Sequence, residues 1–233
     1  MQTNFRPKQL TAADIKNGCV SLYGENETET QICIMNEELR QGLTVLEDYQ
    51  NSITIFGSAR TPETDPYYQI AVRIGNGAAK LGKAVITGGG PGIMEAGNRG
   101  ATEAGGSSLG MTIVLPHEQY TNPHVNVEIP FYYFFTRKTA MRYASQVYLF
   151  FPGGYGTLDE LMETLTLIQT GKIDKVPVVL VGVEFWQPLD QFIRQDLVCK
   201  EMIDEMDPSL YIITDDEQQI LDIIKNAPER VMK

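Results

Sequence analysis

The chain has few residues of the kinds that build disulfide frameworks and metal sites. Its 233 residues include three cysteines and two histidines. The cysteines, at positions 19, 33 and 199, are odd in number and widely spaced, and they form no CxxC pair. This spacing favours free thiols over a disulfide framework or a zinc site. His117 and His124 have the spacing of neither a metal pair nor a catalytic triad, so we expect no bound metal.

Long apolar runs and surplus positive charge are also missing. No stretch approaches the roughly 20 apolar residues of a membrane-spanning helix, although 42% of the residues are hydrophobic. The start of the chain lacks the basic-then-apolar layout of a secretory signal, so we expect a cytoplasmic protein without membrane contact. A net charge of -11, with no basic stripe to offset it, argues against nucleic acid as a partner.

Strand and helix signals alternate along most of the chain. Residues 1–50 are polar and acidic, with a solvated turn expected at 25–30 and a helical pattern from 35 to 49. We interpret them as an N-terminal extension. Residues 51–233 alternate between apolar runs and helical patterns. They predict an α/β domain, a Rossmann-like three-layer sandwich whose mostly parallel sheet is covered by helices on both faces. We expect its strands at 52–56, 84–87, 109–115, 146–151 and 176–181.

Two of these predicted strands end in glycine clusters that open into helical patterns. The clusters are Gly88–Gly92 and Pro152–Gly156. Glycine lets successive backbone N–H groups converge, and a helix start adds partial positive charge, so each cluster suits a phosphate. Because parallel strands end at the same edge of a sheet, both clusters should lie at one site. Gly88–Gly92 also fits a plain tight turn.

Neither cluster has the spacing of a dinucleotide site or of a P-loop. Counting six positions from Gly88 or Gly90 gives Ile93 or Glu95, where a dinucleotide site needs glycine or alanine. Gly171-Lys172 is not followed by serine or threonine, which a P-loop requires. The expected ligand is therefore a mononucleotide without a bound metal.

The run PGGYGTLDE at 152–160 follows Arg137-Lys138 and the run GGGPGIM at 88–94. In combination these motifs resemble the Lonely Guy (LOG) family of nucleoside 5'-monophosphate phosphoribohydrolases, often labelled lysine decarboxylases. The resemblance spans 52–182. It implies cleavage of the N-glycosidic bond of AMP, or of a modified adenine nucleotide such as a cytokinin riboside 5'-monophosphate, to free base and ribose 5-phosphate. It also implies a homodimer or larger homo-oligomer that works without a cofactor.

By this resemblance Glu160 and Arg137 are the catalytic residues. Glycosidic cleavage passes through an oxocarbenium-like transition state, which a carboxylate stabilises while it orients or deprotonates water. We expect the helix start to help keep Glu160 ionised. The residues expected to bind the substrate, with those at 153–157 holding its phosphate, are Gly57, Ser58, Gly88, Gly89, Gly90, Met94, Lys138, Gly153, Gly154, Gly156 and Thr157.

Several of these residues have an alternative interpretation. Thr157 and Glu160 also fit a capping box, in which the glutamate reaches back to a backbone N–H without catalysis. The aromatic run 131–135 suits either the core or stacking on a base, and Thr136 is expected to cap the helix that carries Arg137. Glu95 stands where many family members carry glycine, which leaves the base open. A nucleotide or pterin-cofactor carrier is the rival function.

Overall fold

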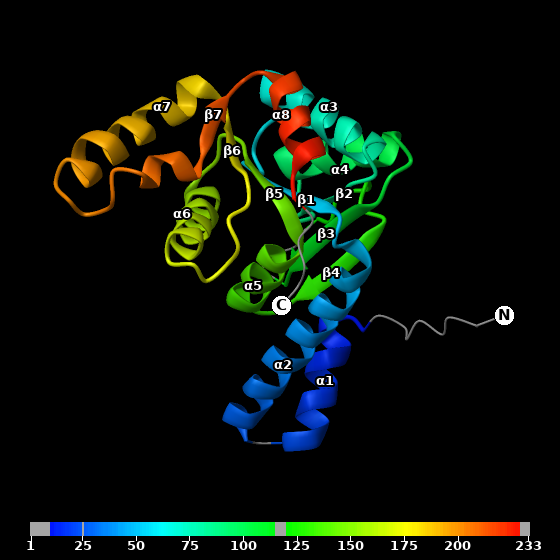
Figure 1. The fold of residues 1–233 in the computed structure, drawn as a ribbon. Helices are drawn as coiled ribbons and strands as arrows, with labels where there is room; N and C mark the ends of the chain where they lie inside the picture. Colours follow the sequence, from blue (N-terminus) through cyan, green and yellow to red (C-terminus); the bar gives the residue numbers. More distant parts are fainter. Residues whose placement is uncertain (1–9, 25, 115–119, 229–233) are drawn as a thin grey trace.

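The computed structural model describes residues 10–24, 26–114 and 120–228, and within them a seven-stranded parallel sheet (Figure 1). Its strands run in the order β4-β3-β2-β1-β5-β6-β7, so the order reverses at β1. The bounds are β1 Ser52–Phe56, β2 Ala84–Thr87, β3 Ser108–Ile113, β4 Val127–Phe131, β5 Ser145–Phe150, β6 Val178–Val181 and β7 Ile212–Thr214.

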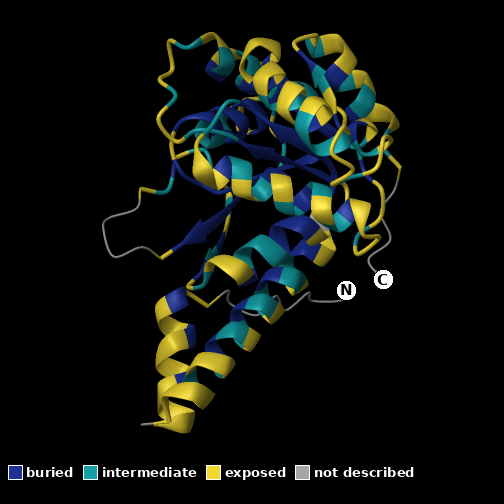
Figure 2. Cartoon of the chain, turned by 90° about the vertical axis from the view of Figure 1, so that its left-hand side faces the viewer, coloured by how far each residue is buried: buried dark blue, intermediate teal, exposed yellow. Residues whose placement is uncertain are grey.

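Helices cover both faces of this sheet, as predicted (Figure 1). One face packs against α3 (Pro66–Lys80), α4 (Ile93–Glu103) and α8 (Glu217–Asn226). The other packs against α5 (Phe134–Ala144), α6 (Tyr155–Gln169) and α7 (Val183–Phe192), which continues as a π-helical segment over Ile193–Val198. The central strands are buried between these layers (Figure 2). The three-layer sandwich expected from the sequence is confirmed.

Two strands were not expected, and both lie at an edge of the sheet. In β4, only Ile129 and Phe131 are buried, and Pro130 lacks the amide that a central strand would need. The other, β7, has three residues, of which only Thr214 is buried. Edge strands give weak sequence signals because they are short and half-exposed. The loop that contains His117 lies partly outside the described residues.

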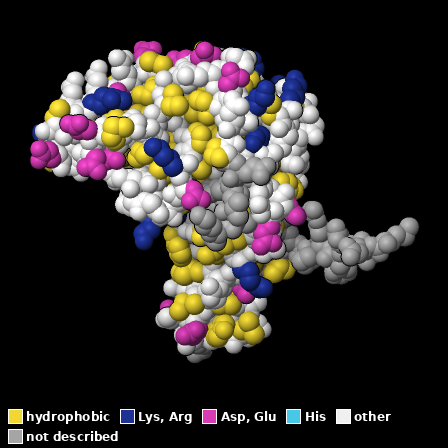
Figure 3. Space-filling view, viewed as in Figure 1, with side chains coloured by type: hydrophobic (Ala, Val, Ile, Leu, Met, Phe, Trp, Pro, Cys, Tyr) yellow, Lys and Arg dark blue, Asp and Glu magenta, His cyan; other side chains and the backbone are white. Residues whose placement is uncertain are grey.

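The first 50 residues contain a hairpin of two helices, α1 (Ala12–Tyr23) and α2 (Glu27–Leu46), which projects from the sheet (Figure 1). Residue 25 of the turn expected at 25–30 lies outside the described residues. From Glu27 onward the expectation is wrong, because α2 begins at Glu27 and the Asn26 side chain accepts from the Glu29 amide. A 3-10 turn, Glu47–Tyr49, leads from α2 to β1. Hydrophobic side chains show on the hairpin surface (Figure 3), and its exposed ones include Val20, Leu22, Tyr23 and Ile32.

Cys19 and Cys33 form a disulfide between α1 and α2, which corrects the expectation of free thiols. The two residues lie 14 positions apart in the sequence, and only the antiparallel hairpin brings them opposite each other. Cys199 is free and exposed. Disulfides are uncommon in a reducing cytoplasm, so the cytoplasmic location stays a prediction. Within the described ranges, none of the helices combines the length and hydropathy of a membrane span.

Candidate active site

A cavity of about 770 Å³ opens at the carboxyl ends of β1, β2 and β5, where the strand order reverses. Ligands of doubly wound sheets bind at this place, and the volume is that of a small-molecule site. The sequence-predicted residues that line it are Gly57, Ser58, Gly88, Met94, Arg137, Lys138, Gly154, Gly156, Thr157 and Glu160. The structure thus brings together both predicted catalytic residues and both glycine clusters.

The loops after these three strands are fastened to one another. The Ser58 amide donates to the Pro152 carbonyl over 3.0 Å, and the Ile93 amide donates to the Ser58 carbonyl over 3.0 Å. Gly92 has a φ of +70°, and a Cβ at this position would collide with the Ser58 carbonyl. A glycine is therefore required at 92 for the loops after β1 and β2 to meet.

Arg137 reaches the cavity from the first turn of α5 and lies against Gly88. A Cβ on Gly88 would overlap the guanidinium nitrogen Nη2 and come within 2.7 Å of Met94 Sδ. The buried Nε of Arg137 has no hydrogen-bond partner among the described residues. Burial lowers the pKa of this guanidinium, and the nearby Glu160 carboxyl works against that shift. Arg137 therefore has donor capacity left for a ligand.

Glu160 faces the same cavity from α6, and its carboxyl oxygen Oε2 also lacks a partner in the described part of the chain. Burial raises the pKa of Glu160 to about 7, against the attraction of Lys138 and Arg137. Desolvation outweighs the favourable charges around Glu160, so its carboxyl group is protonated more readily than an exposed one, whatever help the helix start gives to the ionised form. Near neutral pH both protonation states are populated, which suits proton transfer.

The capping box considered for Thr157 and Glu160 is not formed. Helix α6 begins at Tyr155, and its N-cap, Gly154, contributes no side-chain hydrogen bond. Thr157 is thus already the third residue of the helix, with its hydroxyl beside Gly153. The Glu160 carboxyl does not reach back to the backbone and is available to the cavity.

The start of α6 leaves backbone donors open to the cavity. The Thr157 amide donates to the Gly154 carbonyl over 3.0 Å, whereas the amides of Tyr155 and Gly156 have no partner among the described residues. A Cβ on Gly154 or Gly156 would meet nothing within 4 Å, so open space borders both. Unpaired amides and the helix dipole together make an anion site.

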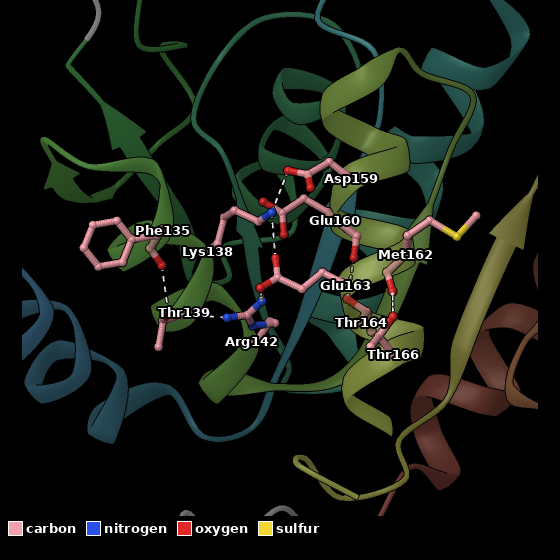
Figure 4. Close-up of polar contacts among 10 residues, drawn as sticks. All are labelled: Phe135, Lys138, Thr139, Arg142, Asp159, Glu160, Met162, Glu163, Thr164 and Thr166. Atoms are coloured by element: carbon pink, nitrogen blue, oxygen red, sulfur yellow. Dashed lines mark hydrogen bonds and ion pairs between the residues drawn. The ribbon is translucent and has the colours of Figure 1, made fainter. Parts of the chain in front are cut away.

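Ion pairs join α5 to α6 close to Glu160 (Figure 4). Lys138 Nζ lies 2.6 Å from Asp159 Oδ2 and 2.6 Å from Glu163 Oε2, and Arg142 also pairs with Glu163. Burial alone would lower the pKa of Lys138, but the two carboxylates outweigh it and raise the pKa. Lys138 therefore stays charged and holds the helix of Arg137 against the helix of Glu160.

Three predicted binding residues, Gly89, Gly90 and Gly153, are not among those that line the cavity. Gly89, with a φ of +74°, packs against Thr112, and Asn122 donates to the carbonyls of Gly89 and Gly90. These glycines shape the turns behind the cavity. Phe134 also lines the cavity, within the aromatic run for which stacking on a base was one interpretation. Sequence reasoning missed the other lining residues, namely Ile55, Phe56, Ala59, Arg60, Tyr155, Leu158 and Asp159.

Asp159 and Glu163 had a signal that could have revealed them. They stand four residues apart on one helix, and Lys138 and Arg142 stand four apart on another, so two oppositely charged stripes were available to pair. No group of metal-binding side chains was found in the described ranges.

The sheet and its cavity define a Rossmann-like α/β protein. Residues 94–224 match the family described as "Possible lysine decarboxylase". The chain is also 30% identical over 181 residues to the cytokinin riboside 5'-monophosphate phosphoribohydrolase LOG of Oryza sativa subsp. japonica, covering 76% of this chain and 69% of that protein. The chain belongs to the LOG family, which confirms the resemblance noted from its motifs.

Two further comparisons concern another relative and a solved structure. A cytokinin riboside 5'-monophosphate phosphoribohydrolase of Rhodococcoides fascians is 28% identical over 155 residues, which cover 63% of this chain and 76% of that protein. The solved structure of the molybdenum cofactor carrier protein of Chlamydomonas reinhardtii is similar with a TM-score of 0.54 at 23% identity. That likeness covers 75% of this chain and 96% of the carrier and shows the shared fold.

Proposed function

We propose that this protein hydrolyses the N-glycosidic bond of a nucleoside 5'-monophosphate, AMP or a modified adenine nucleotide such as a cytokinin riboside 5'-monophosphate. The products are the free base and ribose 5-phosphate. The observation that carries the proposal is that Arg137 and Glu160 line one cavity beside an open helix start, and that each has a buried polar atom without a partner among the described residues. The names of the relatives in rice and Rhodococcoides support it.

In the proposed reaction the substrate phosphate binds the free amides at the start of α6. The ribose then lies beside Glu160, whose carboxylate takes a proton from water as the water oxygen attacks C1'. The bond between C1' and the base nitrogen breaks, and the base leaves with the electron pair. The base takes up a proton from solvent, and Glu160 returns the proton of the attacking water to solvent. Arg137 supplies positive charge on the side of α5, where negative charge develops on the departing base.

Lys138 does not fit the decarboxylase label of the family description. A pyridoxal phosphate decarboxylase needs a lysine whose amine loses its proton to form a Schiff base. Lys138 is the lysine that lines the cavity, and its ion pairs with Asp159 and Glu163 raise its pKa. Its charge serves the contact between α5 and α6 instead.

The test is to incubate the purified protein with a panel of nucleoside monophosphates and to measure free base and ribose 5-phosphate by chromatography. Glu160→Gln should abolish release because an amide cannot accept the proton of water. Glu37→Gln, a half-buried site on α2 that pairs with the exposed Arg40, is the matched control. Full turnover by the Glu160 variant would reject the mechanism. Binding of AMP without release by the wild type would instead identify a carrier.

We also propose that the protein acts as a homo-oligomer, as its family resemblance implies. Exposed aromatic side chains support this, because Phe134 and Tyr155, which line the cavity, and the neighbouring Phe135 are exposed, with Tyr155 93% exposed. Large exposed apolar side chains commonly mark interfaces. Light scattering coupled to size exclusion measures the mass directly, and a mass of 26.0 kDa, that of one chain, would reject the proposal.

A further inference from the structure

A buried carboxylate on the N-terminal hairpin, Glu38, plays no part in the proposed chemistry. It lies in α2 and is 1% exposed. Its oxygen Oε2 accepts from the Tyr132 amide over 2.6 Å, and Oε1 accepts from the Tyr133 amide over 3.2 Å and from the Thr136 hydroxyl. All three donors come from a short segment more than 90 positions away in the sequence.

This segment is the start of α5. The N-cap residue is Tyr133, which makes no side-chain capping hydrogen bond. Thr136, expected from the sequence to be the cap, instead lies in the first turn with its hydroxyl near the Tyr133 carbonyl, 2.8 Å away. In a capping box a glutamate three residues into the helix binds the N-cap amide. Glu38 does so from another helix, and its negative charge suits the helix start.

The hairpin makes further contacts with the same segment. Lys16 Nζ lies 5.3 Å from the centre of the Tyr132 ring. Tyr133 packs against the small cluster formed by Ile15, Cys19, Cys33 and Ile34, which includes the disulfide. A Cβ on Gly42 would come within 2.6 Å of the Phe131 ring, so α2 lies close against the end of β4. The hairpin therefore contacts residues 131–136 through hydrogen bonds, a cation–π contact and apolar packing.

Arg137 follows this segment immediately, and its guanidinium has little room to move. It is the fourth residue of α5, and it lies so close to Gly88 that one added methyl group would overlap it. A displacement of the start of α5 would therefore also displace the Arg137 guanidinium in the cavity. A misplacement of about 1 Å can cost on the order of 100-fold in rate.

We propose that Glu38 is a positioning residue that holds the start of α5, and through it Arg137, in place for the reaction. The proposal rests on the proposed hydrolysis for its kinetic consequence. It gives the N-terminal extension, residues 1–50, a function that its sequence did not reveal. In this proposal the hairpin supports the active site indirectly, by holding α5, which carries Arg137.

The experiment compares Glu38→Gln with the matched control Glu37→Gln in the full chain. Glutamine keeps one acceptor oxygen but turns an NH2 group toward a second donor, so at least one of the three bonds is lost. We expect hydrogen exchange in the peptide that covers the start of α5 to be about tenfold faster. We expect kcat for AMP to fall at least about tenfold, with the affinity for ribose 5-phosphate unchanged because α6 is intact. The control should match the wild type.

The outcomes separate positioning from stability alone. Faster exchange with a lower kcat supports the proposal, whereas faster exchange at wild-type kcat, or unchanged exchange, overturns it. If Glu38→Gln does not fold, Thr136→Ala removes the hydroxyl donor alone and should show the same two changes at smaller size. If the wild type releases no base, the hydrolysis proposal fails. AMP binding then decides the role of Glu38: weaker binding to AMP but not to ribose 5-phosphate supports it, and equal binding overturns it.

Discussion

The two glycine clusters look alike in the sequence but are used differently in the structure. In the first, glycines make room for protein atoms: Gly88 for the Arg137 guanidinium and Gly92 for the Ser58 carbonyl. In the second, Gly154 and Gly156 border open space at the start of α6. A glycine-rich turn at a strand end can therefore mark either a place where the chain packs on itself or a place where a ligand approaches.

The largest effect is expected at Gly88. Gly88→Ala should lower kcat on the order of 100-fold, because the methyl group displaces the guanidinium of Arg137. Steady-state hydrolysis of AMP measures the loss, and calorimetry with ribose 5-phosphate should show that the start of α6 still binds. Gly18→Ala, whose Cβ meets nothing within 4 Å in α1, is the control. Unchanged kcat would show that the first cluster does not set the position of Arg137.

The second cluster leads into α6, which carries the buried carboxyl group of Glu160. This group should make the free energy of unfolding depend on pH. The folded-state pKa of Glu160 is about 7, above its usual 4.5. Between these values the folded state binds more protons than the unfolded state, so stability falls as pH rises. Glu160→Gln should remove this loss and gain on the order of 1 to 3 kcal/mol above the folded pKa, discounted for water in the cavity.

Urea denaturation of the Glu160→Gln variant and the wild type, at a pH above 7 and again below 4.5, checks this expectation. The gain should be present at the higher pH and nearly absent at the lower one. A gain of equal size at both would mean that the Glu160 carboxyl is not the group responsible. The wild-type rate should also respond to pH around 7, where Glu160 titrates.

Substitution of Gly89, also in the first cluster, is expected to affect stability, whereas substitution of Gly88 is expected to affect kcat. Its φ of +74° is left-handed, and Gly89→Ala should cost about 1 to 2 kcal/mol of stability for that conformation alone. A Cβ would also come within 2.7 Å of Thr112 Cγ2. The loss should appear in the free energy of unfolding. A lower AMP affinity at unchanged stability would instead show that Gly89 contacts the ligand, as the sequence predicted.

The smallest effect is expected at Gly156. Gly156→Ala meets no protein atom, and alanine is favoured over glycine in a helix by roughly 0.5 to 1 kcal/mol, so the melting temperature should hold or rise. The affinity for ribose 5-phosphate should weaken by about 1 kcal/mol, since the methyl group stands where the anion approaches a backbone amide. Calorimetry measures it. Unchanged affinity would mean that the phosphate binds elsewhere.

How far the sequence could predict the fold depended on the position of each strand. The strands β1, β2 and β5 are buried throughout. Their apolar runs could therefore be recognised in the sequence. The edge strands β4 and β7 carry mixed signals and were missed. Local patterns also gave wrong helix starts, for α2 at Glu27 and for α5, where Thr136 was expected to be the cap. Caps depend on which acceptor is nearby, and at α5 that acceptor is Glu38.

The candidate site shows the same division. Motifs drew attention to Arg137 and Glu160, which the fold places at one cavity. No motif indicated the raised pKa of Glu160 or the contact of Glu38 with α5. The charged stripes on two helices were compatible with the pairing of Lys138 with Asp159 and Glu163, but only the fold brings those helices together. Each depends on burial or on groups from separate elements.

The sequence by itself determined the alternation of strands and helices, the parallel sheet and the place of the glycine clusters at its carboxyl edge. Those features follow from periodicity and from glycine's backbone freedom, which act locally. The tertiary structure alone decided which glycines face the cavity, how burial shifts the pKa of Glu160 and how the hairpin, with its Cys19–Cys33 disulfide, meets α5. Desolvation and contacts between distant segments exist only once the chain has folded.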